Sequence, residues 1–178
     1  MGRVTAVAPA GLVPAAWLVT IAAHAGLVSA RIVFVALAVM SVLLAAFFLA
    51  SLGEMTGLLG VWQYVIVAGL AATLAGVADV ALLPGNTVLP VTLYAWMLLP
   101  GLAYFPTGTA HTDPGLRNIY LGAATLSLFG AGLYALGHLA GVEPTITLVA
   151  GLATVGAGQT AGIVTAVRQN AGDRGNGH

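Results

Sequence analysis

Cysteine is missing from this chain of 178 residues, and charged side chains are scarce. Without cysteine there is no disulfide, thiol nucleophile, zinc–cysteine site or iron–sulfur cluster. Charged residues make up only 6% of the chain, whereas soluble domains carry about 25%. The five basic and five acidic residues balance, so no basic field is available for nucleic acid. So little charge cannot solvate a globule of this size, and most of the surface is expected to face lipid.

Long apolar runs take the place of charge, because 60% of the residues are hydrophobic. A membrane-spanning helix needs about 20 mostly apolar residues, and six runs meet this requirement. The runs are continuous, whereas strands of a membrane β-barrel would alternate in polarity, so helices are expected. The sequence therefore predicts an all-α, polytopic integral membrane protein, a six-helix transmembrane bundle. The expected spans are 11–30, 31–52, 58–83, 87–105, 116–139 and 144–167.

A single domain, residues 1–168, is expected to contain all the spans, and the polar, glycine-rich tail 169–178 is expected to be disordered. Arg3, the apolar run after it and the small residues of Val28-Ser29-Ala30 imitate a secretory signal peptide. That run is longer than the usual apolar region of about 7–15 residues. We therefore expect a retained first helix and leave cleavage open.

The arginines predict the orientation of the bundle. An even number of spans places both termini on one side of the membrane, together with Arg3, Arg117, Arg168 and Arg174. Only Arg31 falls on the other side. The positive-inside rule then places both termini in the cytoplasm, with the bundle in the cell membrane.

A faint internal repeat relates the two halves of the chain. Aligning position 31 with position 117 superposes RIVFVALAVMSVLLAAFF on RNIYLGAATLSLFGAGLY, and VAGLA occurs at both 67–71 and 149–153. The pattern suits two inverted three-helix halves, a layout common in transporters. Chance similarity between spans rich in alanine, leucine and glycine is the competing explanation, and both stay open.

Small side chains spaced four apart predict the faces along which the helices pack. The fifth span carries Ala123, Ser127, Ala131 and Ala135 at this spacing. Small residues let helices approach closely in lipid, where little hydrophobic drive exists between them. Besides the lipid bilayer, a second copy of the chain is therefore an expected partner, although packing within one chain uses the same faces.

Ionisable side chains inside the spans are candidates for function, because placing them in lipid is costly. His24, Asp79 and His138 fall toward the outer end, with His24 about 9 Å inside its span. The three could bind a divalent metal, the two histidines could ligate a haem b, and His24 with Asp79 could relay protons. In the competing interpretation, His138 only ends its helix, His24 bonds a carbonyl, and Asp79 caps a helix or pairs with Arg31. No HxxxH or ExxH spacing strengthens the metal hypothesis, so no cofactor is expected.

Two further candidates lie deeper in the spans. The amide of Gln159, near the middle of the sixth span, needs a partner across an interface or in a cavity. Pro100-Gly101 predicts a kink or break near Leu99, and a broken helix frees backbone groups that can bind substrate. Structural bonding of the amide and a plain kink are the competing interpretations. In the loop before the fifth span, Asp113-Pro114 predicts a helix N-cap.

No P-loop, GxSxG or HExxH motif occurs, so no catalytic residue is expected. The first choice is a small permease or channel for a small solute or ion. Its candidate substrate or proton-relay residues are Asp79, His24, Gln159, Pro100 and Gly101. A non-catalytic accessory or structural membrane subunit is the alternative, and a redox or metal protein using His24 and His138 is the third. A permease needs its polar groups on one cavity, a subunit has them separately bonded, and a metal protein needs converging rings.

Overall fold

The computed structural model describes residues 3–52, 57, 60–83 and 87–175, with only the backbone described for 3–8 and 170–175. This part of the chain contains helices and no strands. The helices are α1 (Arg3–His24), α2 (Ala30–Ser51), α3 (Gly60–Leu82), α4 (Leu89–Ala110), α5 (Pro114–Ala140) and α6 (Pro144–Gly175). The prediction of an all-α helical membrane bundle is confirmed.

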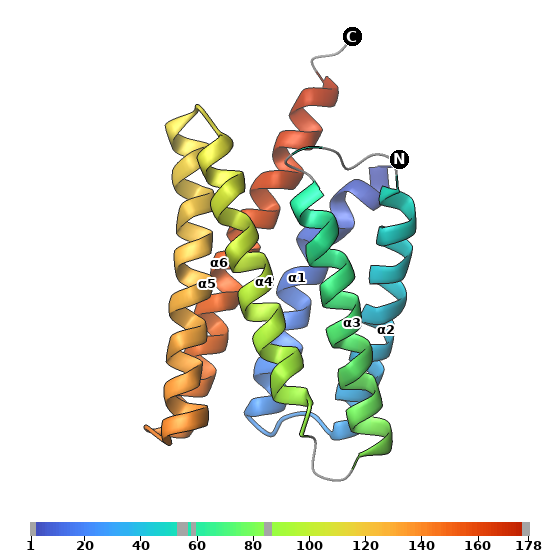
Figure 1. The fold of residues 1–178 in the computed structure, drawn as a ribbon, viewed down its shortest axis with the longest axis vertical. Coiled ribbons are helices and arrows are strands. Elements are labelled where there is room, and N and C mark those ends of the chain that lie inside the picture. Colours follow the sequence, from blue (N-terminus) through green and yellow to red (C-terminus); the bar gives the residue numbers. More distant parts are fainter. Residues whose placement is uncertain (1–2, 53–56, 58–59, 84–86, 176–178) are drawn as a thin grey trace.

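The helices run alternately up and down, so that α1 begins and α6 ends at the same end of the bundle (Figure 1). We call this the upper end, as drawn, and the opposite one the lower end. Packing contacts follow the order α2, α3, α4, α5, α6, α1, with α5 and α6 in the longest contact. The first and last helices therefore pack together, whereas α1 meets α2 at few positions. The first two helices of the second half, α4 and α5, pack extensively on each other, whereas their counterparts α1 and α2 hardly touch. The two expected three-helix halves are therefore not equivalent in their packing.

The number of spans and the limits of the first one differ from prediction. Within the part of the chain that the structure describes, five helices, α2 to α6, are long and apolar enough to cross a membrane, rather than six. The apolar part of α1 with described side chains, Pro9–His24, is shorter. The expected first span, 11–30, also ended too late. Gly26, with φ 70°, ends α1 in a Schellman motif in which the Leu27 N–H donates to the Ala22 carbonyl at 2.8 Å.

Two other helices also differ from the sequence prediction. α6 continues as far as Gly175, so its backbone is helical through residues 169–175 of the tail expected to be disordered; 176–178 lie outside the described residues. α4 is one continuous helix across Pro100-Gly101, so the predicted alternative of a break near Leu99 is wrong. The N-cap prediction is confirmed, because an Asp113 side-chain oxygen accepts from the Leu116 N–H at 2.8 Å.

Two glycines outside the predicted small-residue face bring the backbones of α5 and α6 together. A Cβ atom on Gly130 would lie 2.7 Å from the Gly151 carbonyl oxygen, and one on Gly151 would lie 2.7 Å from the Gly130 carbonyl oxygen. Ala123 and Ser127 of the predicted face are buried. In lipid, such close approach supplies the van der Waals contact that holds helices together.

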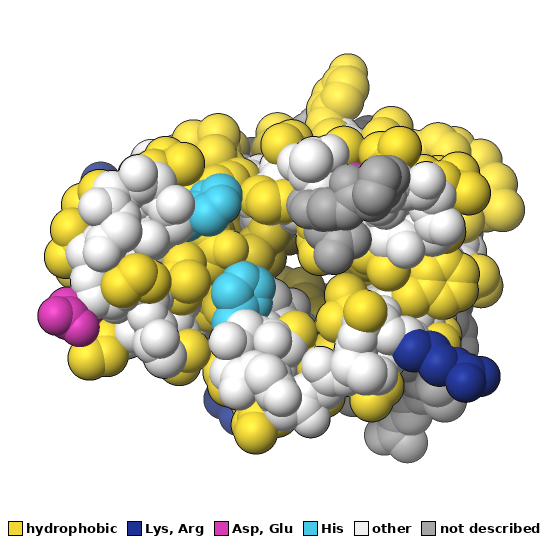
Figure 2. All heavy atoms as spheres, turned by 90° about the horizontal axis from the view of Figure 1, so that it is seen from below, with side chains coloured by type: hydrophobic (Ala, Val, Ile, Leu, Met, Phe, Trp, Pro, Cys, Tyr) yellow, Lys and Arg dark blue, Asp and Glu magenta, His cyan; other side chains and the backbone are white. Residues whose placement is uncertain are grey.

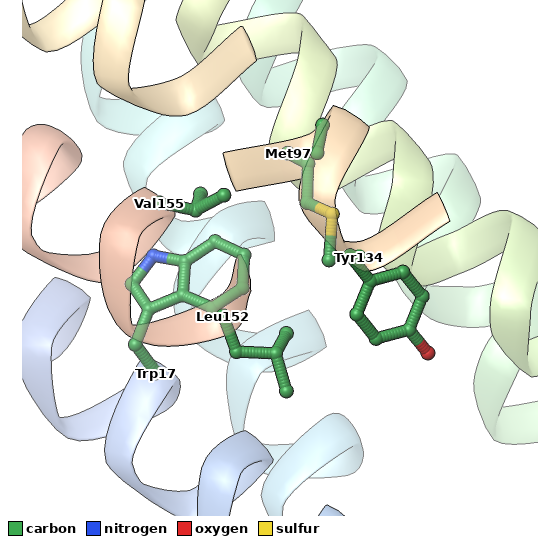
Figure 3. Packing of buried hydrophobic residues seen from close by; sticks show 6 residues of the cluster. Trp17, Met97, Tyr134, Leu152 and Val155 are labelled. Carbon is green, nitrogen blue, oxygen red and sulfur yellow. The ribbon is translucent and has the colours of Figure 1, made fainter. Parts of the chain in front are cut away.

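Next to this contact lies the apolar core, built from α1, α4, α5 and α6. Met97, Leu152 and Val155 are fully buried there, and the rings of Trp17 and Tyr134 pack against them (Figure 3). α1 thus contributes a tryptophan to the core, and cleavage after Ala30 would remove it. The ring of Tyr134 belongs to this core, but its hydroxyl points away from Trp17 (Figure 3).

We predict that Gly151→Ala destabilises the bundle, because the added methyl group would meet the Gly130 carbonyl and the Tyr134 backbone nitrogen, both at 2.7 Å. Overpacking of this kind costs about 1–3 kcal/mol. The free energy of unfolding in detergent micelles measures the effect. Gly122→Ala is the matched control, because nothing lies within 4 Å of its added methyl group. Equal stability of the two variants would contradict the close α5–α6 contact.

Candidate functional site

Four polar aromatic side chains meet at the lower end of the bundle: His24 of α1, Tyr94 of α4, and Tyr134 and His138 of α5. We call them the His–Tyr cluster. Tyr134 is its centre, with ring centroids 5.4 Å from Tyr94, 5.5 Å from His24 and 5.7 Å from His138. The structure therefore brings the two predicted histidines together through two tyrosines that the sequence did not single out.

The ends of α1 and α5 position the two histidines. His138 follows Tyr134 by one helical turn, so both side chains leave the same face of α5. Gly141, with φ 67°, ends α5 just after His138, as Gly26 ends α1 just after His24. His24 therefore lies in the last turn of its helix and not about 9 Å inside a longer span, which corrects the sequence prediction.

Hydrogen bonds fix the proton positions at His24. Its Nδ1 lies 2.9 Å from the Thr20 carbonyl oxygen, which can only accept, so Nδ1 carries the proton. In the neutral ring, Nε2 then accepts, and the Tyr134 hydroxyl donates to it at 2.9 Å. A second pair joins the Tyr94 hydroxyl to His138 Nδ1 at 3.2 Å. The cluster thus consists of two phenol–imidazole pairs in ring contact.

The cluster is accessible from the lower end, although its centre is buried. Tyr134 is only 3% exposed, whereas His24 and His138 are exposed. Seen from below, two histidine side chains border a recess, and the acidic and basic side chains lie toward the rim (Figure 2). A small molecule in the recess would meet imidazole and phenol groups before it met a charge.

A three-ligand metal site does not form from the predicted residues. Among the described residues, no three histidine, aspartate or glutamate side chains are grouped closely enough to hold a metal ion, so His24, His138 and Asp79 do not converge. Both ring nitrogens of His24, one of the two predicted haem ligands, are hydrogen-bonded. Iron could bind Nε2 only after displacing the Tyr134 hydroxyl.

Asp79 completes the start of α4. Its carboxylate is fully buried, and Oδ2 accepts from the backbone N–H groups of Val88 and Leu89 at 3.0 and 2.8 Å. A carboxylate at this place satisfies free N–H groups and complements the positive end of the helix dipole. The competing interpretation of Asp79 as a helix cap therefore describes these bonds, and none of them involves Arg31 or His24.

Gln159 bonds α4 one turn before Pro100, which the sequence could not indicate. The Gln159 Nε2 donates to the Trp96 carbonyl at 2.9 Å, and its Oε1 accepts from Trp17 Nε1 at 3.2 Å. The residue is 4% exposed and joins α1, α4 and α6. Gly101 lies at the α4–α5 contact, since a Cβ there would be 3.0 Å from the Ser127 Cβ.

Two surface grooves lie away from these polar groups. One, of about 390 Å³, is lined by apolar residues of α3 and α4 and by Tyr64. The other, of about 330 Å³, lies between α2 and α3 beside Arg31. Neither groove is lined by His24, Asp79, His138 or Gln159. The sequence candidates thus lie outside both of these grooves.

The tyrosines of the cluster differ in how far the sequence could have identified them. Tyr134 lies four residues before His138, a spacing that places both on one helix face and could have been read from the sequence. Tyr94 carries no such signal, because its contact depends on how α4 and α5 are aligned. The contact of His111 could not be read from the sequence either: its ring stacks on Tyr120 near the upper end, with centroids 5.2 Å apart.

Comparison with known proteins adds no relative: no family model, curated protein or solved structure matches this chain.

We predict that Asp79→Ala lowers the stability of the bundle by about 1–2 kcal/mol, the cost of a lost N-cap. Asp79→Asn should lose less, because its amide oxygen still accepts from the α4 N–H groups. Unfolding in detergent micelles compares the two. Asp113→Ala is the matched control, since Asp113 caps α5 from an exposed position with one bond. If Asp79→Asn were as damaging as Asp79→Ala, the negative charge and not the capping oxygen would be what matters.

Proposed function

We propose that this protein is a small permease in which the His–Tyr cluster receives a small solute at the lower end of the bundle. One observation carries the proposal. α1, α4 and α5 bring four hydrogen-bonding aromatic side chains together, and two histidine side chains border a recess open to the lower face (Figure 2). Packing alone would be served by apolar rings, and burying a hydroxyl such as that of Tyr134 costs free energy unless it is bonded.

The chemistry of the cluster favours an uncharged, hydrogen-bonding solute. Its polar atoms are phenol and imidazole groups, which can both donate and accept. No carboxylate or guanidinium group is bonded to any of the four side chains among the described residues. A fully charged ion would therefore lose its water without gaining a counter-charge.

In this proposal α1 also crosses the membrane, which brings the number of spans to six. The protein is then a multi-pass protein of the cell membrane with both termini in the cytoplasm. Support comes from the side-by-side packing of α1 with α6 and from the shared end at which α1 begins and α6 ends (Figure 1). Arg117 and Arg168 lie at that upper end, near the start of α5 and in the upper part of α6. The lower end, with the His–Tyr cluster, then faces outward.

Permeability of proteoliposomes tests the function directly. Stopped-flow swelling with formamide, urea and glycerol should be faster for at least one solute than in protein-free vesicles. Tyr134→Phe should reduce that rate about three- to tenfold, the usual effect of losing one hydrogen bond. His111→Ala, which changes a histidine at the other end, should leave the rate unchanged. Rates equal to those of empty vesicles for every solute would reject a permease for this class of solute.

Reporter fusions test the orientation. In the proposed topology, a reporter that is active only in the cytoplasm should be active both after residue 178 and in the 111–113 loop. The reason is that α4 ends, α5 begins and α6 ends at the same face (Figure 1). Activity in the 141–143 turn would contradict the proposed orientation.

An accessory membrane subunit is the second candidate, and a specific observation favours it. Asp79 and Gln159 both bond backbone groups of α4, as expected of polar residues that only stabilise packing. The apolar groove between α3 and α4 adds a surface on which a partner helix could lie. This candidate gains if no solute crosses the proteoliposome membrane.

A further inference from the structure

Pro100 leaves a gap in the hydrogen-bond ladder of α4. In an α-helix the N–H of residue 100 would donate to the carbonyl of Trp96, four residues earlier. Proline has no N–H, so the Trp96 carbonyl loses its helical donor. Inside a bilayer, no water replaces the missing bond. The continuous helix across Pro100 therefore needs a donor from elsewhere.

Gln159 supplies that donor from α6. Its Nε2 donates to the Trp96 carbonyl at 2.9 Å and lies 3.4 Å from the Met97 carbonyl oxygen. Its Oε1 accepts from the indole N–H of Trp17 at 3.2 Å, so the amide is anchored to α1 as well. We call this set of bonds the Gln159 bridge. It is buried beside the apolar core and joins three helices at one point.

The helical segment that this bridge holds also carries Tyr94, two residues before Trp96. At the other end of the same segment, Asp79 accepts from the N–H groups of Val88 and Leu89. Thr92 Oγ1 also donates to the Ala72 carbonyl at 2.8 Å, and Trp96 Nε1 donates to Thr73 Oγ1 at 2.9 Å. Residues 88–96 are therefore attached to α3 along their length, and the Gln159 bridge attaches their upper end to α6. Tyr94 lies within this segment and reaches His138 Nδ1 at 3.2 Å.

We propose that Gln159 is a positioning residue for the His–Tyr cluster: it replaces the donor that Pro100 removes and so holds Tyr94 against His138. The significance of this for solute passage rests on the proposed function, whereas the bridge itself does not. Releasing the bridge would detach this segment of α4 from α6, leave it bonded to α3 alone and loosen the Tyr94–His138 pair.

A double-mutant cycle tests the bridge. Gln159→Met keeps the length of the side chain and removes the amide, so we expect the folding equilibrium constant in detergent to fall about tenfold, as for an unsatisfied buried carbonyl. In a Pro100→Ala background, the new N–H can bond the Trp96 carbonyl. The same Gln159→Met change should then cost clearly less. Gln159→Leu provides a second version of the cycle if Gln159→Met does not accumulate.

Trp17→Phe is the matched control for the cycle. It removes the bond to Gln159 Oε1 but leaves the amide N–H free to bond α4. Its effect should therefore be the same with Pro100 and with Pro100→Ala. Additive effects of Gln159→Met and Pro100→Ala would overturn the proposal, because coupling is expected only between groups that share a partner.

Nitrogen NMR of protein labelled with ¹⁵N-histidine tests the link to the cluster. The His138 Nδ1 resonance should shift in Gln159→Met and return toward its wild-type position in the double variant. An unchanged His138 resonance in all four proteins would overturn the positioning role, even if the stabilities were coupled. Neither measurement uses solute flux. A failed flux assay with an intact cycle would therefore reject the permease and not the bridge.

Discussion

Every backbone polar group within the lipid must find a partner inside the protein, and α4 is the helix in which this constraint is hardest to meet. Its first N–H groups have no helical acceptors, and Pro100 removes a donor in its middle. Asp79 satisfies the first need and Gln159 the second. Asp79 of α3 and Gln159 of α6, two polar side chains that are costly to bury, thus supply the hydrogen-bond partners that the α4 backbone lacks. The position of α4, and with it that of Tyr94, depends on these bonds together with those that Thr92 and Trp96 donate to α3.

Close backbone contact sets the other half of the arrangement. Where Gly130 and Gly151 face each other, α5 and α6 lie so close that the contact is made by backbone atoms and leaves no room for side chains. The opposite case is α2, whose side chains at Val35, Val39 and Val42 are more than half exposed and face lipid. The His–Tyr cluster therefore lies on the tightly packed side, among α1, α4 and α5.

The sequence predicts what depends on composition and local chemistry, and it fails where alignment between helices decides. Apolar length predicted α2, α3 and α5 closely, and Asp113-Pro114 predicted the start of α5. The first span was misplaced because the run continues through Gly26, whose positive φ is a structural and not a compositional property. The meeting of Gln159 with the carbonyl left free by Pro100 could not be predicted, because it joins residues 63 apart in sequence.

The same limit applies to the candidate site. The sequence predicted that His24, Asp79 and His138 lie at a similar depth in the membrane and form one outer group. Similar depth does not bring side chains together, because they can still lie on different sides of the bundle. In the bundle, the two histidines share Tyr134, whereas Asp79 bonds the start of α4. Position along each span could be read from the sequence, and position around the bundle could not.

Structural and transport roles of these polar residues are not exclusive alternatives. The fully buried side chains of Met97, Leu152 and Val155 belong to the apolar core that the ring of Tyr134 joins, and the hydroxyl of Tyr134 points away from Trp17 (Figure 3). In this arrangement the polar groups at His24 and those at Gln159 are therefore not connected by hydrogen bonds. A solute that crossed the bundle would require α4, which contributes Met97, to move relative to α6. The bond from Gln159 to the Trp96 carbonyl is one that such a movement must break, so a residue that stabilises the fold would also determine whether the path opens.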